Sequence, residues 1–301
     1  MPEYPEVVLY IHALEPRVVG QRLERLRIVS PSLLRSVDPP AAAFAGKVLT
    51  GMERIGKRIV FAFEDDLFAV LHLMIAGRLQ WKAPGTPIPR RLGHAAFEFE
   101  NGSLLVTEAG TKKRAHLHLV RGRDALADFD RGGIDPLNAT LPEFTAALQR
   151  ENRTLKRALT DPRILSGIGN AHSDEVLHAA ELSPARLTSR LEATEIERLY
   201  EVTRSSLAGW ANLLIEEADG DFPGKVTAFH PRMAVHGRYG KPCPRCGGTI
   251  QRIRYADNET NYCPTCQTGG KLLADRAFSR LLRDDWPRTM DELEQHFQER
   301  R

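Results

Sequence analysis

Apolar residues near the N-terminus recur at the spacing of an amphipathic helix. Val7, Val8, Ile11 and Leu14 fall on one side of a helix that starts near Pro5. Proline is common in the first turn of a helix, because the N–H that it lacks would have no partner there. The pattern therefore predicts one leading helix.

Between about residues 20 and 120 the pattern changes to the alternation of apolar and polar residues that is typical of β-strands. Residues 58–73 form two such runs on either side of Asp65-Asp66. Residues 95–108 alternate on both sides of Asn101-Gly102, and this dipeptide is a strong signal for a tight hairpin turn. This part of the chain is predicted to be a β-sandwich.

A cluster of Gly and Pro residues in "RGGIDPLNAT" (131–140) interrupts the β pattern, and we place a domain boundary there. Beyond it the spacing of apolar residues predicts a series of helices, followed by a basic stretch, the cysteines and a short helical tail. The predicted helices cover residues 141–151, 153–162, 170–182 and 193–218.

The four cysteines occur as two Cys-x2-Cys pairs separated by sixteen residues: Cys243, Cys246, Cys263 and Cys266. Each pair directs two thiolates to one side of a turn, and a hairpin of this length returns the second pair to the first. The spacing predicts a structural zinc ion with four thiolate ligands and no open position for catalysis. Disulfides and an iron centre are the alternatives, and both fit the turn at Gly247-Gly248 less well.

These patterns predict an α+β protein. Its parts are an N-terminal β-sandwich domain with a leading helix (1–132), a helical domain (133–222), a basic zinc-finger hairpin (223–270) and a C-terminal helical tail (271–301).

The overall composition says less about the class of function than the positions of the charged residues along the chain. The formal charge of +3 and the pI near 8.7 are too weak to indicate a nucleic-acid partner. However, residues 224–254 contain seven Lys or Arg and no Asp or Glu, and residues 111–123 form a second basic cluster. Either cluster alone is explained by a solvated surface, but the two together favour a polyanionic partner.

Other classes of protein are disfavoured. No apolar run approaches the roughly 18 residues of a membrane span. Glu3 and Glu6 make the N-terminus unlike a secretory signal. Because all four cysteines belong to one metal pattern, none is left for disulfides, and we expect a reducing, cytoplasmic location. A monomer is expected.

The extreme N-terminus reads Met-Pro-Glu. A helix start explains this sequence, but a small second residue also allows removal of the initiator Met. The amine of Pro2 would then be the free terminus, and an α-amino group has a pKa of about 7.7–8.0, well below that of lysine. Pro2 is therefore a candidate nucleophile.

A second short motif is the glycine turn Gly167-Ile168-Gly169-Asn170, which precedes a predicted helix. Asn170 is placed to cap that helix. The backbone N–H groups of such a turn, together with the helix dipole, favour an anion such as a DNA phosphate. An ordinary connection between two helices explains the motif equally well.

Three separated stretches together resemble the bacterial formamidopyrimidine-DNA glycosylase / endonuclease VIII family of base-excision repair enzymes. They are "PEYPEV" at the N-terminus, "SGIGNAHSDEVL" (166–177) and the cysteine hairpin "VHGRYGKPCPRCGGTI…YCPTCQ". "RIGKRIVF", "LHLMIAGRL" and "GIDPL" also look like family segments, so the resemblance covers nearly the whole chain. It implies a β-sandwich, a helix–two-turns–helix element and a zinc finger that together bind damaged double-stranded DNA.

The resemblance also implies roles for individual residues. Pro2 would attack C1′ of the damaged nucleoside and form a Schiff base, and Glu3 would handle protons. Lys57 looks like the family lysine that binds phosphate beside the lesion. Asn170 resembles the asparagine that holds the DNA backbone, and Lys156 resembles a lysine near the lesion pocket.

Two regions depart from the family pattern. Asn258 stands where the zinc-hairpin tip usually has an arginine, and Arg252 or Arg254 is a candidate to compensate for its loss. Where a methionine usually fills the gap left by the flipped nucleotide, this chain has Ile75 after Met74.

The intercalation loop is also changed. Its usual arginine and phenylalanine are replaced by Lys112 and Arg114, so the aromatic wedge is absent. These changes predict a divergent branch whose preferred base need not be an oxidised purine.

The leading hypothesis is therefore a bifunctional DNA glycosylase and abasic-site lyase that holds one structural Zn²⁺ and no organic cofactor. The alternative is an abasic-site or damaged-DNA binding protein that has lost base excision. A zinc-ribbon RNA-binding protein is a third interpretation, but it gives no reason for the N-terminal Pro-Glu.

Overall fold

The computed structural model describes residues 1–224, 226–255, 258–273, 287–289, 292 and 295. The chain divides into two compact units. The first comprises Met1–Arg131 and Ala208–Ala228, and the second comprises Gly132–Leu207 and Phe229–Arg301. Among the described residues, every helix is too short or too polar to cross a membrane.

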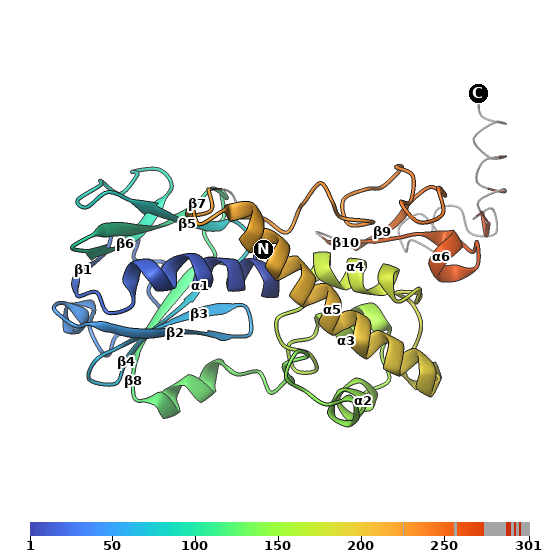
Figure 1. Cartoon of the computed structure of the whole chain (residues 1–301), viewed down its shortest axis with the longest axis horizontal. Coiled ribbons are helices and arrows are strands. Elements are labelled where there is room, and N and C mark those ends of the chain that lie inside the picture. Colours follow the sequence, from blue (N-terminus) through green and yellow to red (C-terminus); the bar gives the residue numbers. More distant parts are fainter. Residues whose placement is uncertain (225, 256–257, 274–286, 290–291, 293–294, 296–301) are drawn as a thin grey trace. The chain divides into compact units, whose positions relative to one another are not determined.

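The first unit contains two four-stranded antiparallel sheets, with strand orders β1-β6-β7-β5 and β2-β3-β4-β8 (Figure 1). Their apolar faces meet in one core, which confirms the predicted β-sandwich. The strands are β1 (Leu23–Ile28), β2 (Leu49–Ile55), β3 (Arg58–Phe63), β4 (Leu67–His72), β5 (Gly77–Lys82), β6 (Gly93–Phe99), β7 (Gly102–Glu108) and β8 (His116–Arg121).

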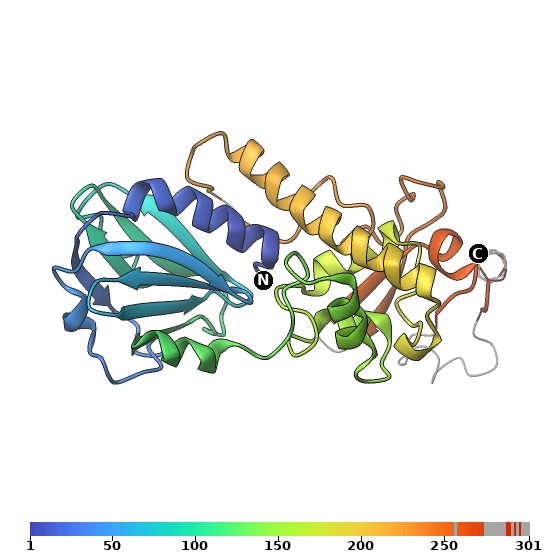
Figure 2. The same cartoon turned by 60° about the horizontal axis from the view of Figure 1, so that its bottom comes forward.

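The predicted leading helix is α1 (Tyr4–Val18), which runs beside the sheets (Figure 2). It contributes Tyr10 and Leu14, both fully buried, to the core of the sandwich. Two short 3-10 helices, η1 (Ala41–Phe44) and η2 (Arg123–Phe129), complete the regular structure of this unit.

Both predicted hairpins form, but one turn lies a residue earlier than expected. Asp65 and Asp66 take left-handed backbone angles between β3 and β4. In the other hairpin Gly102 already pairs with Phe99, so the turn is formed by the two residues before Gly102. Gly102 is required by packing instead, since a Cβ there would lie 2.2 Å from the Trp81 ring.

The second unit is mainly helical and contains a small hairpin. The four helices predicted between residues 141 and 218 are present, although three are shorter than expected. The elements are α2 (Leu141–Gln149), α3 (Leu155–Thr160), α4 (Asn170–Ala179), η3 (Thr188–Arg190), β9 (Gln251–Tyr255), β10 (Asn258–Tyr262) and α6 (Pro264–Thr268).

A long helix, α5 (Ala193–Ala218), belongs to both units. Its first part lies in the second unit, and the part from Ala208 onward lies in the first. The predicted tail at 271–301 falls largely outside the described residues.

Candidate functional site

The N-terminus is enclosed in the first unit. Pro2 and Glu3 are buried, and Glu3 is the residue that precedes α1. The backbone N–H of Glu3 donates to Oε2 of Glu6 at 2.7 Å, which closes the first turn of the helix. Burial lowers the pKa of the terminal amine, which is that of Met1, and the charges of Arg78 and Lys57 lower it further, while Glu3 and Glu6 oppose this shift.

A short chain of contacts joins the start of α1 to the turn that carries Lys57. Gly56 has a φ of +61° in the β2–β3 turn. The Arg54 guanidinium donates to the carbonyl oxygen of Gly56 at 2.7 Å and lies 4.4 Å from the centroid of the Tyr4 ring. This arrangement holds Lys57, which is half-buried, at the same end of the unit as the N-terminus. Sequence reasoning missed Arg54, because nothing in the pattern links it to Tyr4.

The turn between β4 and β5 exposes Ile75, whose relative accessibility is 55%. The N–H of Gly77 donates to the carbonyl oxygen of Leu73 at 2.9 Å, and a Cβ on Gly77 would lie 2.2 Å from that oxygen. The Arg78 guanidinium donates to the carbonyl oxygens of Gly77, at 2.6 Å, and Ile75, at 3.3 Å. Arg78, also missed by sequence reasoning, thus links the Ile75 turn to the N-terminal amine.

The loop between β7 and β8 is shaped by a buried carboxylate. Glu108 accepts hydrogen bonds from the N–H groups of Arg114, at 3.0 Å, and Ala115, at 3.3 Å. Nε2 of His94 lies 3.2 Å from the same carboxylate, and both side chains are buried. Lys112 and Arg114 are left exposed.

This loop lies beside the Ile75 turn, because the N–H of Ala109 donates to the carbonyl oxygen of Ala76 at 3.4 Å. The structure therefore brings four predicted features together in the first unit: the N-terminus, the Lys57 turn, the Ile75 turn and the Lys112–Arg114 loop.

In the second unit, the glycine turn leads into α4 as predicted, but the predicted cap is wrong. Gly169 is the N-cap residue, and Asn170 is the first residue of the helix. The Asn170 side chain donates from Nδ2 to the carbonyl oxygen of Glu259 on β10 at 2.8 Å instead. Asn170 therefore ties the helix to the cysteine hairpin.

Lys156 is turned into the second unit, where its side chain is 12% exposed. Its ammonium donates to the carbonyl oxygen of Asn170 at 2.6 Å and to the carboxylate of Asp174. The fully buried Asp174 also accepts from Nδ1 of His236, at 2.8 Å, and from the N–H of Asn261, at 3.1 Å. One carboxylate thus joins α3, α4, the segment before the cysteines and β10.

Glu175 forms a second anchor on α4. Its carboxylate accepts from three successive N–H groups: those of Ala234 at 2.7 Å, Val235 at 2.9 Å and His236 at 2.9 Å. Sequence reasoning missed Asp174 and Glu175. The adjacent acidic residues carry no local signal of burial, because their partners other than Lys156 lie about sixty or more residues away in the chain.

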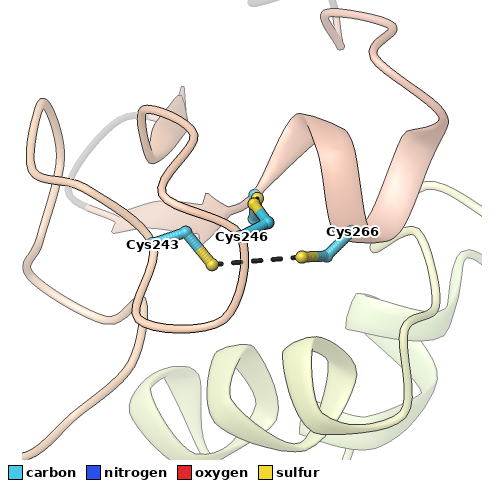
Figure 3. Close-up of side chains that lie close together, drawn as sticks. Cys243, Cys246 and Cys266 are labelled. Atoms are coloured by element: carbon cyan, nitrogen blue, oxygen red, sulfur yellow. Dashed lines mark hydrogen bonds between the residues drawn. The ribbon is translucent and has the colours of Figure 1, made fainter.

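The four cysteine sulfurs converge in the second unit, all within 4.8 Å of one another. Figure 3 shows the sulfurs of Cys243 and Cys266 directed toward each other, 3.9 Å apart. The sulfurs of Cys246 and Cys263 are 3.4 Å apart. A tetrahedral zinc ion with Zn–S bonds of about 2.3 Å requires sulfurs roughly 3.8 Å apart, so the four thiolates fit structural zinc.

His178, on the last turn of α4, supports this cluster. Its Nε2 lies 3.2 Å from the sulfur of Cys243. Burial, and then the charge of Arg245, lower the pKa of His178 to about 4, so that the ring is neutral at physiological pH. An N–H from a neutral imidazole to a thiolate is the kind of contact that orients a metal ligand.

The two hairpin residues predicted to bind DNA, Arg254 and Asn258, are both exposed and lie on facing strands near the hairpin tip. Arg252 is held differently. Its guanidinium is 3.2 Å from the Glu259 carboxylate and 4.2 Å from the centroid of the Tyr239 ring. Of these two arginines, Arg254 is the more exposed.

Comparison with known proteins assigns each of these regions. Residues 1–114 match the formamidopyrimidine-DNA glycosylase N-terminal domain, and residues 133–209 match the formamidopyrimidine-DNA glycosylase H2TH domain. Residues 240–269 match a zinc finger found in FPG and IleRS. The chain belongs to the formamidopyrimidine-DNA glycosylase family.

Individual relatives within the formamidopyrimidine-DNA glycosylase family are moderately similar. The formamidopyrimidine-DNA glycosylase of Symbiobacterium thermophilum is 33% identical over 283 residues, which cover 89% of both chains. That of Thermus thermophilus is 34% identical over 278 residues, which cover 90% of this chain and all of the relative.

Solved structures agree with this assignment. The Lactococcus lactis FPG (MutM) in a complex with FAPY-dG containing DNA superposes with a TM-score of 0.79 at 26% identity. The match covers 88% of this chain and all of that one. MutM in complex with carbocyclic 8-oxo-G containing DNA gives a TM-score of 0.79, also at 26% identity, and covers 89% of this chain and all of that one. The predicted β-sandwich, helix–two-turns–helix element and four-cysteine hairpin are confirmed as the architecture of this family.

Proposed function

We propose that this chain is a DNA glycosylase with abasic-site lyase activity that uses Pro2 as its nucleophile. The observation that carries the proposal is the buried N-terminus: Pro2 and Glu3 are buried, and the charges of Arg78 and Lys57 act on the amine of Met1 beside them. Membership of a DNA glycosylase family supports the reaction class. Removal of Met1 would make the Pro2 nitrogen the terminal amine, and the surroundings that lower the pKa of the Met1 amine support its use as a nucleophile.

The proposed reaction has two stages. The Pro2 nitrogen forms a bond to C1′ of the damaged nucleoside, and the C1′–N bond to the base breaks, so that the base leaves with the electron pair and takes up a proton. Opening of the sugar ring gives an iminium ion. Loss of a proton from C2′ then breaks the C3′–O bond, which cleaves the strand, and water releases the amine. Glu3 is proposed to carry protons in these steps.

The remaining predicted residues are proposed to hold damaged double-stranded DNA. Lys57 and Arg254 would contact phosphates, and Ile75 would fill the gap left by the flipped nucleotide. The exposed Lys112, Arg114 and Asn258 would contact the strands beside that gap. Asn170 and Lys156 engage other residues of the second unit, so we propose that Asn170 positions the cysteine hairpin and that Lys156 fixes the backbone at Asn170.

The proposed division of labour follows the predicted domains. Residues 1–132 would carry the chemistry, residues 133–222 and the hairpin at 223–270 would bind DNA, and residues 271–301 would form a tail. One Zn²⁺ held by the four cysteines would maintain the hairpin without joining the reaction, because all four ligand positions are taken by thiolates.

Borohydride trapping tests the proposal. The purified full chain, with its N-terminus confirmed by mass spectrometry, is mixed with a duplex that contains one abasic site and is reduced. A covalent adduct at Pro2 is expected. Pro5→Ala serves as a matched control that changes a nearby proline of the first helical turn and should retain the adduct. No adduct with the wild type, or an undiminished adduct with Pro2→Gly, would refute the mechanism.

A second function is favoured by the exposed loop at Lys112 and Arg114, which offers cations where an aromatic wedge is expected. The chain would then bind abasic or damaged DNA without excising a base. It predicts salt-sensitive binding to duplexes and no strand cleavage across a panel of oligonucleotides that each carry one lesion.

A further inference from the structure

A row of rings lies on the face of the β2-β3-β4-β8 sheet that is turned away from the main core. Leu117 and Leu119 of β8 point into that core. Because side chains alternate along a strand, His116 and His118 of β8 point to the opposite face. His72 on β4 pairs with His116 in the register of the two strands. We call His72, His116, His118 and Phe129 the histidine row.

The rings of the row pack edge to face. The ring centroids of His72 and His116 are 5.0 Å apart, those of His116 and His118 are 5.5 Å apart, and those of His118 and Phe129 are 5.0 Å apart. The interplanar angles lie between 67° and 88°. Packing of this kind occupies ring faces, so the row is poorly suited to stack bases and offers its ring nitrogens instead.

The hydrogen bonding of His116 determines what its ring can offer. Its Nδ1 lies 3.2 Å from the carbonyl oxygen of Arg114. A carbonyl oxygen only accepts, so Nδ1 carries the hydrogen of this bond. In the neutral ring Nε2 then carries a lone pair and no hydrogen, so it repels an anion. After protonation Nε2 becomes a donor, and the ring can bind an anion.

The row is surrounded mainly by positive charge. Arg58 of β3 donates to the carbonyl oxygen of Phe129 at 3.1 Å, and the N–H of Arg35 donates to the carbonyl oxygen of Leu117 at 2.9 Å. Burial, and then Arg58 and Arg35, lower the pKa of His116. Burial, His116, Arg58 and Arg35 do the same for His118.

Other charges lie at the ends of the row. Burial, and then the charges of Arg58, His116 and Lys57, lower the pKa of His72. Burial, and then Arg131, lower that of Arg58. Asp128 and Asp130 flank Phe129: Asp128 is exposed, and both carboxylates belong to the segment that ends η2. Arrays of cations and imidazoles of this kind are suited to phosphate oxygens.

We propose that His116 and His118 of the histidine row bind a phosphodiester of the DNA duplex, in addition to the phosphate contact proposed for Lys57. In this site His116 and His118, in their protonated forms, donate to the non-bridging phosphate oxygens, and Arg58 and Arg35 supply the fixed charge. The inference rests on the proposed function for the identity of the partner. It assigns a pH-dependent contact to residues that the reaction itself does not use.

DNA binding then takes up protons. A bound phosphate stabilises imidazolium, so the pKa of each histidine is higher in the complex than in the free protein. At pH values between the pKa in the free protein and the higher pKa in the complex, DNA binds more tightly as the pH falls. At pH values above the pKa in the complex or below the pKa in the free protein, these groups no longer make the affinity depend on pH. Since the free value lies below 6.5, the effect is expected in mildly acidic to neutral solution.

The test measures binding of the full chain to a duplex with a tetrahydrofuran abasic analogue, which has no electrophile at C1′ and so removes the chemistry of the amine. Apparent Kd is measured from about pH 5.5 to about pH 8.0, a range that brackets an ordinary histidine pKa. We expect tighter binding of the wild type at low pH. A double variant His116→Gln/His118→Gln should lose at least half of the pH dependence, whereas His12→Gln, at an exposed histidine of α1, should retain it.

Two further measurements separate the possible failures. NMR titration of the wild type with and without the duplex should show upward shifts in the pKa values of His116 and His118, and this does not depend on the folding of any variant. A wild type with pH-independent affinity, a double variant with an unchanged pH dependence, or unshifted histidines would overturn the inference. Borohydride trapping of the same protein preparations on a separate duplex with a true abasic site tests the proposed function: a missing adduct there, beside an intact pH dependence with the analogue, would reject the lyase and retain the site.

Discussion

The side chain of Asn170 donates a 2.8 Å hydrogen bond to the carbonyl oxygen of Glu259, eighty-nine residues away in the chain. This bond joins the first turn of α4 to the strand β10 of the cysteine hairpin. Asp174, one helical turn later, bonds to the N–H of Asn261 on the same strand, and His178, a further turn on, reaches the sulfur of Cys243. One face of α4 therefore positions the hairpin.

The first prediction concerns Asn170 and Arg254. If Asn170 acts by positioning the hairpin, Asn170→Ala should weaken DNA binding partly by displacing Arg254. We expect Asn170→Ala to cost about 1–3 kcal/mol of binding free energy, because it leaves a carbonyl without its donor. Arg254→Ala should reduce the salt dependence of binding by about one unit of log–log slope.

A double-mutant cycle measured by equilibrium binding tests this coupling. The loss in the double variant should be smaller than the sum of the two single losses, because both act on one contact. Strict additivity would show that Asn170 acts on DNA independently of the hairpin. Lys241→Ala, at an exposed lysine of the same unit, provides a control that should be additive with Asn170→Ala.

The second prediction concerns Asp174, which is fully buried and accepts hydrogen bonds from Lys156, His236 and Asn261. Asp174→Asn keeps the size of the side chain but leaves the Lys156 ammonium without its counter-charge. Breaking one side of a buried ion pair is expected to lower the free energy of unfolding by about 3–5 kcal/mol.

Denaturant unfolding of the zinc-loaded protein measures this effect. Asp161→Asn is a suitable comparison, because Asp161 also pairs with arginines but lies nearer the surface, and its loss should cost less. Equal stability of Asp174→Asn and the wild type would show that the buried carboxylate contributes nothing net.

A structural feature could be predicted from the sequence where the residues that form it are close together in the chain, and not where they are far apart. The zinc site follows from spacing, because each Cys-x2-Cys pair is a local turn, and the pair of strands around Asp65-Asp66 follows from local alternation. The sequence predicts Asn170 as a helix cap because capping depends only on neighbouring residues. The observed partner of its side chain, Glu259, lies in another element and leaves no local signal. The burial of Lys156 could not be predicted, since its partner Asp174 becomes an acceptor only after α3 and α4 pack.

The end of the first unit that holds the N-terminus shows the same limit. The candidates Pro2, Glu3 and Lys57 come from short motifs, whereas Arg54 and Arg78 connect those motifs through contacts with backbone carbonyls. A guanidinium that donates to a turn leaves no sequence signal. The charge of Arg78 close to the amine also changes what is expected of the chemistry.

The third prediction concerns the pH dependence of adduct formation. Burial and the charges of Arg78 and Lys57 lower the pKa of the Met1 amine. We expect the same surroundings to lower the pKa of the Pro2 amine once Met1 is removed, so that more of it is unprotonated at neutral pH. The rate of adduct formation should rise with pH as the amine loses its proton and then level off. Arg78→Gln removes a positive charge, raises the pKa of the amine and should move this rise to higher pH.

Single-turnover trapping across a pH series checks the shift. Arg78→Lys retains the charge and should keep the rise near its wild-type position, even if the Ile75 turn is altered and the plateau falls. A change in the plateau alone, with the same midpoint in Arg78→Gln, would mean that Arg78 acts only through the turn.

The fourth prediction concerns zinc. Elemental analysis should find one zinc per chain, and a strong chelator should remove it together with DNA binding, because the hairpin that carries Arg254 is held by the four thiolates. Cys246→Ser should reproduce the effect of the chelator, whereas His178→Gln should retain zinc but bind it about 10–100-fold more weakly, as expected for a residue that orients a ligand. Re-addition of zinc should restore binding in the wild type and not in Cys246→Ser. DNA affinity that survives complete removal of zinc would show that the hairpin holds its shape without the metal.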